Sequence, residues 1–223
     1  MSSTLEAPPL ADPPAEGLQA ATPVVALPRR TIDAVLIAFG AVAMVVFLVA
    51  GGLLTWGSNF SDDYVTRELS SQNITFPDAD ALKTEGRQDL LEFAGQRLTT
   101  GDQAEGYASY INGHLQKIAD GQTYADLGGP ERAANTAVTD AVAAGAPQDQ
   151  VDALKATAAG ISGQRNSLFK GETLRGLLLS AYAWATVGTI AGIAAIGAFI
   201  AAAAMAVLVF LGVMHHRRTV RSA

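Results

Sequence analysis

The segment from Phe169 to Gly188 reads FKGETLRGLLLSAYAWATVG, and its formal charge ends at Arg175. The next formally charged residue is Arg217, so the whole run from Gly176 to Met214 carries no formal charge. As a helix rising about 1.5 Å per residue, this run would extend about 58 Å. The hydrocarbon core of a bilayer is about 30 Å thick, or about 40–45 Å with its headgroups. The run therefore predicts a membrane-spanning helix with a surplus that lies outside the lipid.

A second apolar run, AVLIAFGAVAMVVFLVAGGLL, extends from Ala34 to Leu54. Both runs exceed the roughly 18 residues that distinguish a spanning helix from a buried core helix. A cleaved signal peptide is the alternative for the first run. Its apolar core is longer than the roughly 7–15 residues of such a peptide, and no clear A-x-A-like site follows it, so we predict an uncleaved anchor.

Basic residues near the ends of the two spans predict their orientation. Two spans place both termini on one side of the membrane and the segment from Thr55 to Arg175 on the other. Five basic residues flank the spans on the side of the termini: Arg29, Arg30, Arg217, Arg218 and Arg221. Three flank them on the loop side: Arg67, Lys170 and Arg175. Because Lys and Arg near span ends are retained inside, both termini are predicted to be cytoplasmic.

The two tryptophans divide the long apolar run. Trp56 follows the first span and Trp184 precedes the most apolar part of the second. Both are predicted to anchor the loop-side interface, where amphipathic rings prefer to lie. The segment 176–186 is then a membrane-proximal stem helix, and its leucines require protein neighbours. These leucines are Leu177, Leu178 and Leu179.

The predicted protein is an all-α membrane protein in which two transmembrane helices flank an extracytoplasmic helical bundle. Its parts are a disordered Pro-rich cytoplasmic tail (1–30), transmembrane helix 1 (31–54), the extracytoplasmic helical domain (55–175), the stem (176–186), transmembrane helix 2 (187–211) and a basic cytoplasmic tail (212–223). The N-terminal tail contains six of the nine prolines and buries too little to offset its ordering entropy.

Apolar spacing within the domain predicts helices over 62–72, 87–98, 102–120 and 130–144, with Gly121 capping the third. A further helix begins near Pro147 and carries a seam at spacings of three and four, formed by Val151, Leu154, Ala158, Ile161, Arg165 and Leu168. Packing in a small bundle is favoured over a dimeric coiled coil. No useful alternating segment appears, so the whole chain is predicted to be helical.

Chemistry-bearing residues are sparse. Cysteine is absent, which removes thiolate catalysis and thiolate metal sites, and His114 is the one histidine of the domain. A structural role for His114 is favoured over catalysis. Seventeen acidic against ten basic residues give Thr55 to Arg175 a net charge of −7, which speaks against nucleic acid. We therefore predict no catalytic, cofactor or metal site.

Gly188 and Gly192 form a GxxxG motif in the second span, which allows close helix approach. The helix that approaches them is either the first span, through Gly40, Ala43 and Ala50, or a second copy of the chain. Packing within the chain is at least as well supported by the sequence.

The stretches AEGYASYINGHLQKIADGQTYADL and LFKGETLRGLLLSAYAWATVGTIA resemble a family of actinobacterial two-span membrane proteins of unknown function. The similarity covers residues 31–211. Relatives are sometimes labelled aromatic ring-opening dioxygenases, but non-haem iron oxygenases typically use two His and a carboxylate, and this domain offers only His114. The resemblance implies a Gram-positive envelope protein and supplies no catalytic residues.

Three functional hypotheses follow. The favoured one is an accessory or interaction module, not an enzyme, whose partners are the lipid bilayer and a membrane or envelope protein. A ligand sensor comes second, because the cytoplasmic segments are too short to carry an output domain of their own. A membrane-anchored enzyme using carboxylates and His114 comes third, because the chain lacks a cluster of catalytic residues.

Overall fold

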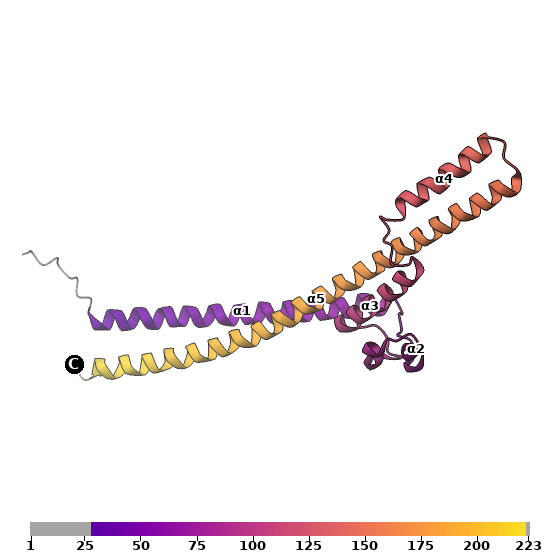
Figure 1. The fold of residues 1–223 in the computed structure, drawn as a ribbon. Coiled ribbons are helices and arrows are strands. Elements are labelled where there is room, and N and C mark those ends of the chain that lie inside the picture. Colours follow the sequence, from indigo (N-terminus) through magenta and orange to yellow (C-terminus); the bar gives the residue numbers. More distant parts are fainter. Residues whose placement is uncertain (1–27, 222–223) are drawn as a thin grey trace, which may run out of the picture.

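The computed structural model describes residues 28–221, with side chains described through residue 218. Two long helices, α1 (Arg29–Ser71) and α5 (Gln148–Arg221), lie side by side over much of their length (Figure 1). Four short elements between them form the head, which lies at the far end from the chain termini. No strand occurs among residues 28–221, so the prediction of an all-helical chain is confirmed for this region. Of the predicted disordered tail of residues 1–30, residues 1–27 lie outside the described residues, whereas Arg29 and Arg30 already belong to α1, so the predicted boundary is wrong there.

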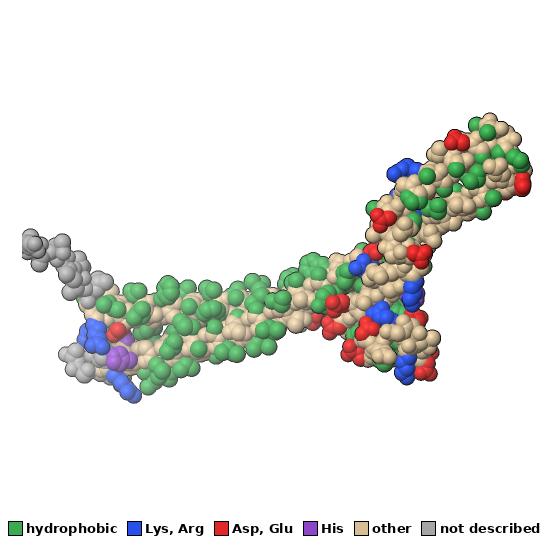
Figure 2. Space-filling model, in the orientation of Figure 1, with side chains coloured by type: hydrophobic (Ala, Val, Ile, Leu, Met, Phe, Trp, Pro, Cys, Tyr) green, Lys and Arg blue, Asp and Glu red, His purple; other side chains and the backbone are tan. Residues whose placement is uncertain are grey.

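Both long helices are long and apolar enough to cross a membrane. Only 11% of the most apolar window of each helix is buried, so these side chains do not form the core of a soluble domain. Figure 2 shows hydrophobic side chains along this helical pair, while charged side chains gather on the head and at the opposite end. The predicted pair of apolar helices is therefore present.

Helix α1 does not end with its apolar run but continues without a break to Ser71. Its last turns bury Val65 and Leu69 in the head, as the apolar spacing of 62–72 predicts. The chain leaves the helix at Asn73, which takes a left-handed conformation with φ of 52°. The first apolar run is thus continuous with an element of the head.

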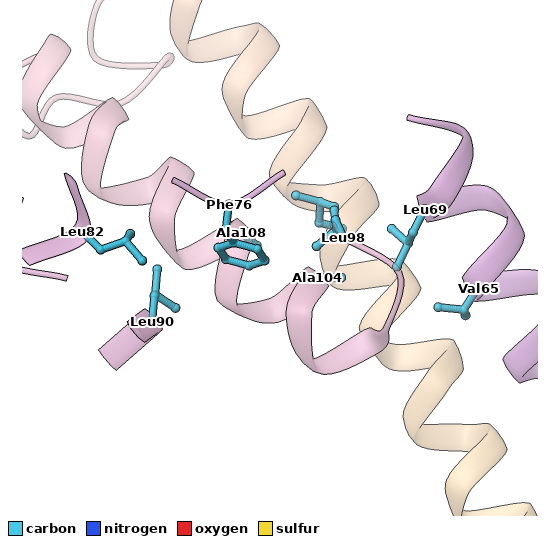
Figure 3. Packing of buried hydrophobic residues seen from close by; sticks show 9 residues of the cluster. Val65, Leu69, Phe76, Leu82, Leu90, Leu98, Ala104 and Ala108 are labelled. Carbon is cyan, nitrogen blue, oxygen red and sulfur yellow. The ribbon is translucent and has the colours of Figure 1, made fainter. Parts of the chain in front are cut away.

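The core of the head is built from α2 (Ala79–Thr84), the 3₁₀ helix η1 (Gln88–Phe93) and α3 (Gly101–Ile118), packed against α1 and α5 (Figure 3). Helix α2 was not expected from the sequence; it begins at Asp78, whose side chain accepts a hydrogen bond from the Ala81 amide. Leu82 and Leu98 are the largest fully buried side chains. This core is confined to the head, beyond the apolar helical pair.

The prediction of a helix over 87–98 is wrong beyond Phe93. The chain turns at Gly95, whose φ of 69° favours glycine, and returns in extended form. The Leu98 amide donates to the Ile74 carbonyl at 2.9 Å, and Thr75 pairs with Arg97 in an isolated antiparallel bridge. The regularly spaced apolar residues are buried, but they lie on two separate segments: Leu90 on η1 and Leu98 on the extended segment after it.

Helix α3 closely matches the predicted range of 102–120. Thr100 and Gln103 form a capping box at its start. At its end Asp120, with φ of 48°, takes the first left-handed position, and the Gly121 amide donates to the Gln116 carbonyl. Gly121, the predicted cap, therefore takes part in a Schellman-type helix end. It follows Asp120, the first left-handed residue.

Helix α4 (Gly128–Ala143) and the first half of α5 form an outer hairpin that projects beyond the rest of the head (Figure 1). The turn between them contains Gly145, with φ of 66°, and the Pro147 carbonyl accepts the first bond of α5 from Val151. The predicted seam on α5 faces this chain's own elements: Val151, Ala158 and Leu168 are buried. Leu168 packs with Leu115 of α3.

Candidate functional site

The GxxxG motif lies against α1 of the same chain. A Cβ added to Gly188 would meet the Ser61 Cβ at 2.8 Å, and one added to Gly192 would meet the Ser58 Oγ at 3.0 Å. The expected contacts with Gly40, Ala43 and Ala50 are wrong for this pair, because antiparallel pairing brings the start of the second span to the end of the first. Gly40 instead faces Val209. The sequence offered no signal for Ser58 or Ser61.

Both predicted interface tryptophans, Trp56 and Trp184, are exposed on the outside of the helical pair. They do not lie at the same level. The Ser61 hydroxyl donates to the Trp184 carbonyl at 2.6 Å, and Trp56 precedes Ser61 by five residues. At about 1.5 Å per residue, Trp56 lies about 7 Å farther from the head.

The three stem leucines do not share one environment. Leu178 is 3% exposed and belongs to the core of the head. Leu177 is 65% exposed and Leu179 is also exposed, so the expectation that all three have protein neighbours is wrong. Consecutive helical residues point in directions about 100° apart, and the adjacent α1 and α3 cover only one of these directions. The stem itself is an uninterrupted part of α5.

The arginines used to predict topology lie at one end of the molecule. Arg29 and Arg30 begin α1, and Arg217, Arg218 and Arg221 lie in the last turns of α5. Basic and histidine side chains gather at this end in Figure 2. The side chain of Arg221 lies outside the described part of the chain. The fold thus brings both basic segments to the end opposite the head.

His114 belongs to a polar cluster on the head. Its Nε2 lies 3.3 Å from Glu85 Oε2, and its Nδ1 lies 3.2 Å from the Tyr110 carbonyl oxygen. The Tyr110 hydroxyl donates to Glu85 at 3.1 Å. Partial burial and this bond to a carboxylate raise the pKa of Tyr110. The cluster ties α3 to the residue that ends α2, and sequence spacing does not reveal this contact because the two segments are distant in the chain.

A neighbouring ion pair fastens η1 to α3. Arg87 donates two bonds to Asp89, the shorter at 2.6 Å, and one to Ser109 of α3. The hydrogen bonds from Arg87 lower the pKa of Asp89, and the same bonds raise the pKa of Arg87. The Nε and Nη2 atoms of this guanidinium are thereby bonded within the protein. These contacts join η1 to α3, which is a structural role.

Arg165, the arginine that interrupts the seam, is paired across the outer hairpin. Its guanidinium binds Glu131 of α4 and lies 4.0 Å from the centre of the Tyr124 ring. Ser162 donates to the same carboxylate at 2.6 Å. The Ser162 and Arg165 bonds lower the pKa of Glu131. A charge at a seam position is thus balanced by a partner on α4, and these groups hold the hairpin together.

Within the described residues, no group of three or more His, Asp or Glu side chains is placed to hold a metal ion. Comparisons with family models, curated proteins and solved structures found no match to this chain. Function is therefore inferred from the arrangement of the helices and from the surface that the head presents.

Helix α4 forms part of that surface. Its extensive contacts are with α5, and Gly128 is its one buried residue. Most of the remaining residues of α4 have small or polar side chains, and Val142 is exposed near its end. The outer hairpin is therefore open to a partner along most of its length.

Proposed function

We propose that this protein is a membrane-anchored interaction module: α1 and α5 cross the bilayer as a hairpin, and the head binds another membrane or envelope protein outside the cytoplasm. The observation that carries the proposal is the continuity of α5. One helix of 74 residues joins the second apolar run to the tip of the outer hairpin. A single helix transmits position and orientation along its whole length.

The dimensions of α5 support presentation at a distance from the membrane. With the span at 187–211, the part of α5 from Gln148 to Thr186 lies on the head side. It corresponds to about 58 Å of helix. Contacts with α1, α3 and α4 along this length brace the helix. The outer hairpin would stand well beyond the headgroups, within reach of a neighbouring protein.

The distribution of side chains supports the membrane assignment and its orientation. Apolar side chains on the helical pair face outward, where they would be costly in water and favourable in lipid. The basic end of the pair suits the cytoplasmic side. The acidic net charge of the loop favours a protein partner over nucleic acid. The resemblance to two-span actinobacterial proteins is compatible with this proposal.

An alkaline phosphatase fusion tests the orientation. The enzyme is inserted after Gly145, in the exposed turn of the outer hairpin, or appended after Ser222. Because alkaline phosphatase becomes active only outside the cytoplasm, the first fusion should be active and the second inactive. The reverse pattern would overturn the orientation. Activity of both fusions would show that one of the two proposed spans does not cross the membrane.

Site-specific photo-crosslinking in native membranes tests the interaction. A photoreactive residue replaces Val142 or Thr139, both exposed on α4, and the control replaces Val151, which is buried. We expect one adduct of constant mass from the exposed positions and none from the control. Absence of adducts from both Val142 and Thr139 would contradict an interaction through the outer hairpin.

A further inference from the structure

A groove separates α1 from α5 immediately on the head side of the Ser61–Trp184 hydrogen bond. Its volume is about 280 Å³. Apolar and aromatic side chains make up most of its lining, among them Tyr64 and Leu69 on α1, Ile74 in the following loop, and Leu174, Leu177 and Trp184 on α5. Three polar residues, Glu68, Gln72 and Ser180, also line it. The core of the head leaves this space unfilled, although Leu178 beside it is buried.

The groove is continuous with the apolar surface of the helical pair. A smaller recess is lined by Phe60, Ser61, Tyr64 and Trp184, and it shares Tyr64 and Trp184, two of its three aromatic residues, with the groove. Phe60 stacks between Trp56 and Tyr64, so an exposed aromatic row leads along α1 to the groove. From Trp184 the lining extends along α5 to Leu174, or about 15 Å toward the head.

We propose that this groove binds one alkyl chain of a membrane lipid, drawn from the bilayer toward the head; the proposal rests on the membrane insertion of α1 and α5 proposed above. An alkyl chain requires no hydrogen bonds, whereas most of this lining offers none to the backbone groups of a peptide. Sites for drug-sized ligands typically begin at roughly 300 Å³. The groove lies just below that size, which suits a slender chain. The adjoining bilayer is the nearest source of such chains.

Binding of this kind gives the head a direct contact with lipid. The chain would touch α1 and α5 where they diverge, beside buried Val65 and Leu178. Its presence would fill space between the two helices and stabilise their separation. The groove is thereby a lipid-binding site belonging to the head, distinct from the general contact of the spans with the bilayer.

Fluorescence quenching by brominated lipid tests the proposal. The purified full-length protein, carrying Trp56→Phe and Trp184→Phe, is placed in phosphatidylcholine vesicles with bromine near the chain ends. A single reporter is introduced by Leu177→Trp, in the lining of the groove, or by Leu179→Trp, outside that lining. Leu179 is exposed and lies two residues nearer the predicted span. We expect loss of fluorescence from the Leu177→Trp reporter and little loss from the Leu179→Trp reporter.

Simple immersion in lipid predicts the opposite order, because the Leu179→Trp reporter is closer to the bilayer. Equal quenching, or stronger quenching of that reporter, would therefore overturn the proposal. Ser180→Phe fills the groove from its exposed rim and should abolish quenching at the Leu177 position, whereas Ala183→Phe, outside the groove, should preserve it. Persistence of quenching with Ser180→Phe would also overturn the proposal.

A third reporter separates this proposal from the membrane assignment. In a Trp184→Phe variant, Trp56 is the single reporter, and it lies on the apolar helical pair. Its fluorescence should be quenched by lipids that carry bromine near the membrane interface. Quenching of Trp56 without quenching of the Leu177→Trp reporter would overturn the groove site and leave the membrane assignment intact. No quenching of Trp56 would overturn the membrane assignment and the groove site together.

Discussion

The Ser61 hydroxyl donates a 2.6 Å hydrogen bond to the Trp184 carbonyl, and joins α1 to α5 at the point where the apolar helical pair meets the head. Gly188 lies one turn after Trp184 and directly faces Ser61. Because Gly188 has no side chain, the Ser61 hydroxyl can reach the Trp184 carbonyl, which lies one turn before Gly188. Ser61 is buried there with its hydroxyl satisfied, which makes this polar contact compatible with an apolar neighbourhood.

Gly188→Ala should therefore weaken the contact between α1 and α5. The new Cβ would lie 2.8 Å from the Ser61 Cβ, so the helices must move apart. We expect a loss of about 1–3 kcal/mol in the free energy of unfolding. Thermal unfolding in detergent, followed by circular dichroism, measures the change.

Gly176→Ala is the matched control, because nothing lies within 4 Å of a Cβ at this helical position. Alanine favours the helix over glycine by up to about 1 kcal/mol, so this variant should be as stable as the parent or more stable. Equal effects of the two substitutions would contradict close packing at Gly188.

Leu178→Glu should disrupt the head. Leu178 is buried in its core, and an unpaired buried charge costs about 3–5 kcal/mol. The adjacent Leu177→Glu places the same charge at an exposed position and should leave the fold intact. Limited proteolysis of membrane-inserted protein should show rapid cleavage of the head in the first variant alone. Wild-type resistance of Leu178→Glu would show that the stem is not part of the core.

The outer hairpin should lose stability in acid through Glu131. Bonds from Ser162 and Arg165 lower the pKa of this carboxyl below its ordinary value of 4.5. The carboxylate therefore stabilises the hairpin above the unfolded pKa, and this contribution is lost as pH falls through the lower folded pKa. Hydrogen exchange of α4, corrected for intrinsic rates, should show decreasing protection as pH falls from about 5 toward about 3. Glu131→Gln should remove this pH dependence. If the protection of α4 depended on pH equally in the variant and the parent, the role assigned to Glu131 would be wrong.

His114→Gln should have a small effect. The His114 contacts with Glu85 and the Tyr110 carbonyl are partly exposed, and such contacts contribute no more than about 1 kcal/mol. We expect a slightly lower melting temperature and an unchanged crosslink from α4. Complete loss of a cellular phenotype at normal abundance and melting would instead favour a catalytic or ligand-binding role for this histidine.

Length and periodicity were sufficient to predict several elements. The uncharged run from Gly176 to Met214 leaves little choice but a long helix with an apolar surface, and the apolar stripe of 102–120 predicts α3 almost to its ends. These features are local, because the backbone hydrogen bonds of a helix close within one turn or so of the chain. The short helix α2, which Asp78 caps, was not predicted.

Other features depended on residues brought together from distant parts of the chain. The apolar spacing of 87–98 fits a helix equally well, and the bond from Leu98 to Ile74 decides that the segment turns back instead. Similarly, only the antiparallel arrangement of α1 and α5 selects Ser61 as the neighbour of Gly188 and leaves Leu177 exposed beside buried Leu178. Sequence alone determined the two long apolar helices and α3, because their periodicity extends over many turns of one segment. The tertiary structure decided which faces meet and where a groove remains, because packing depends on the register between two helices that are far apart in the sequence.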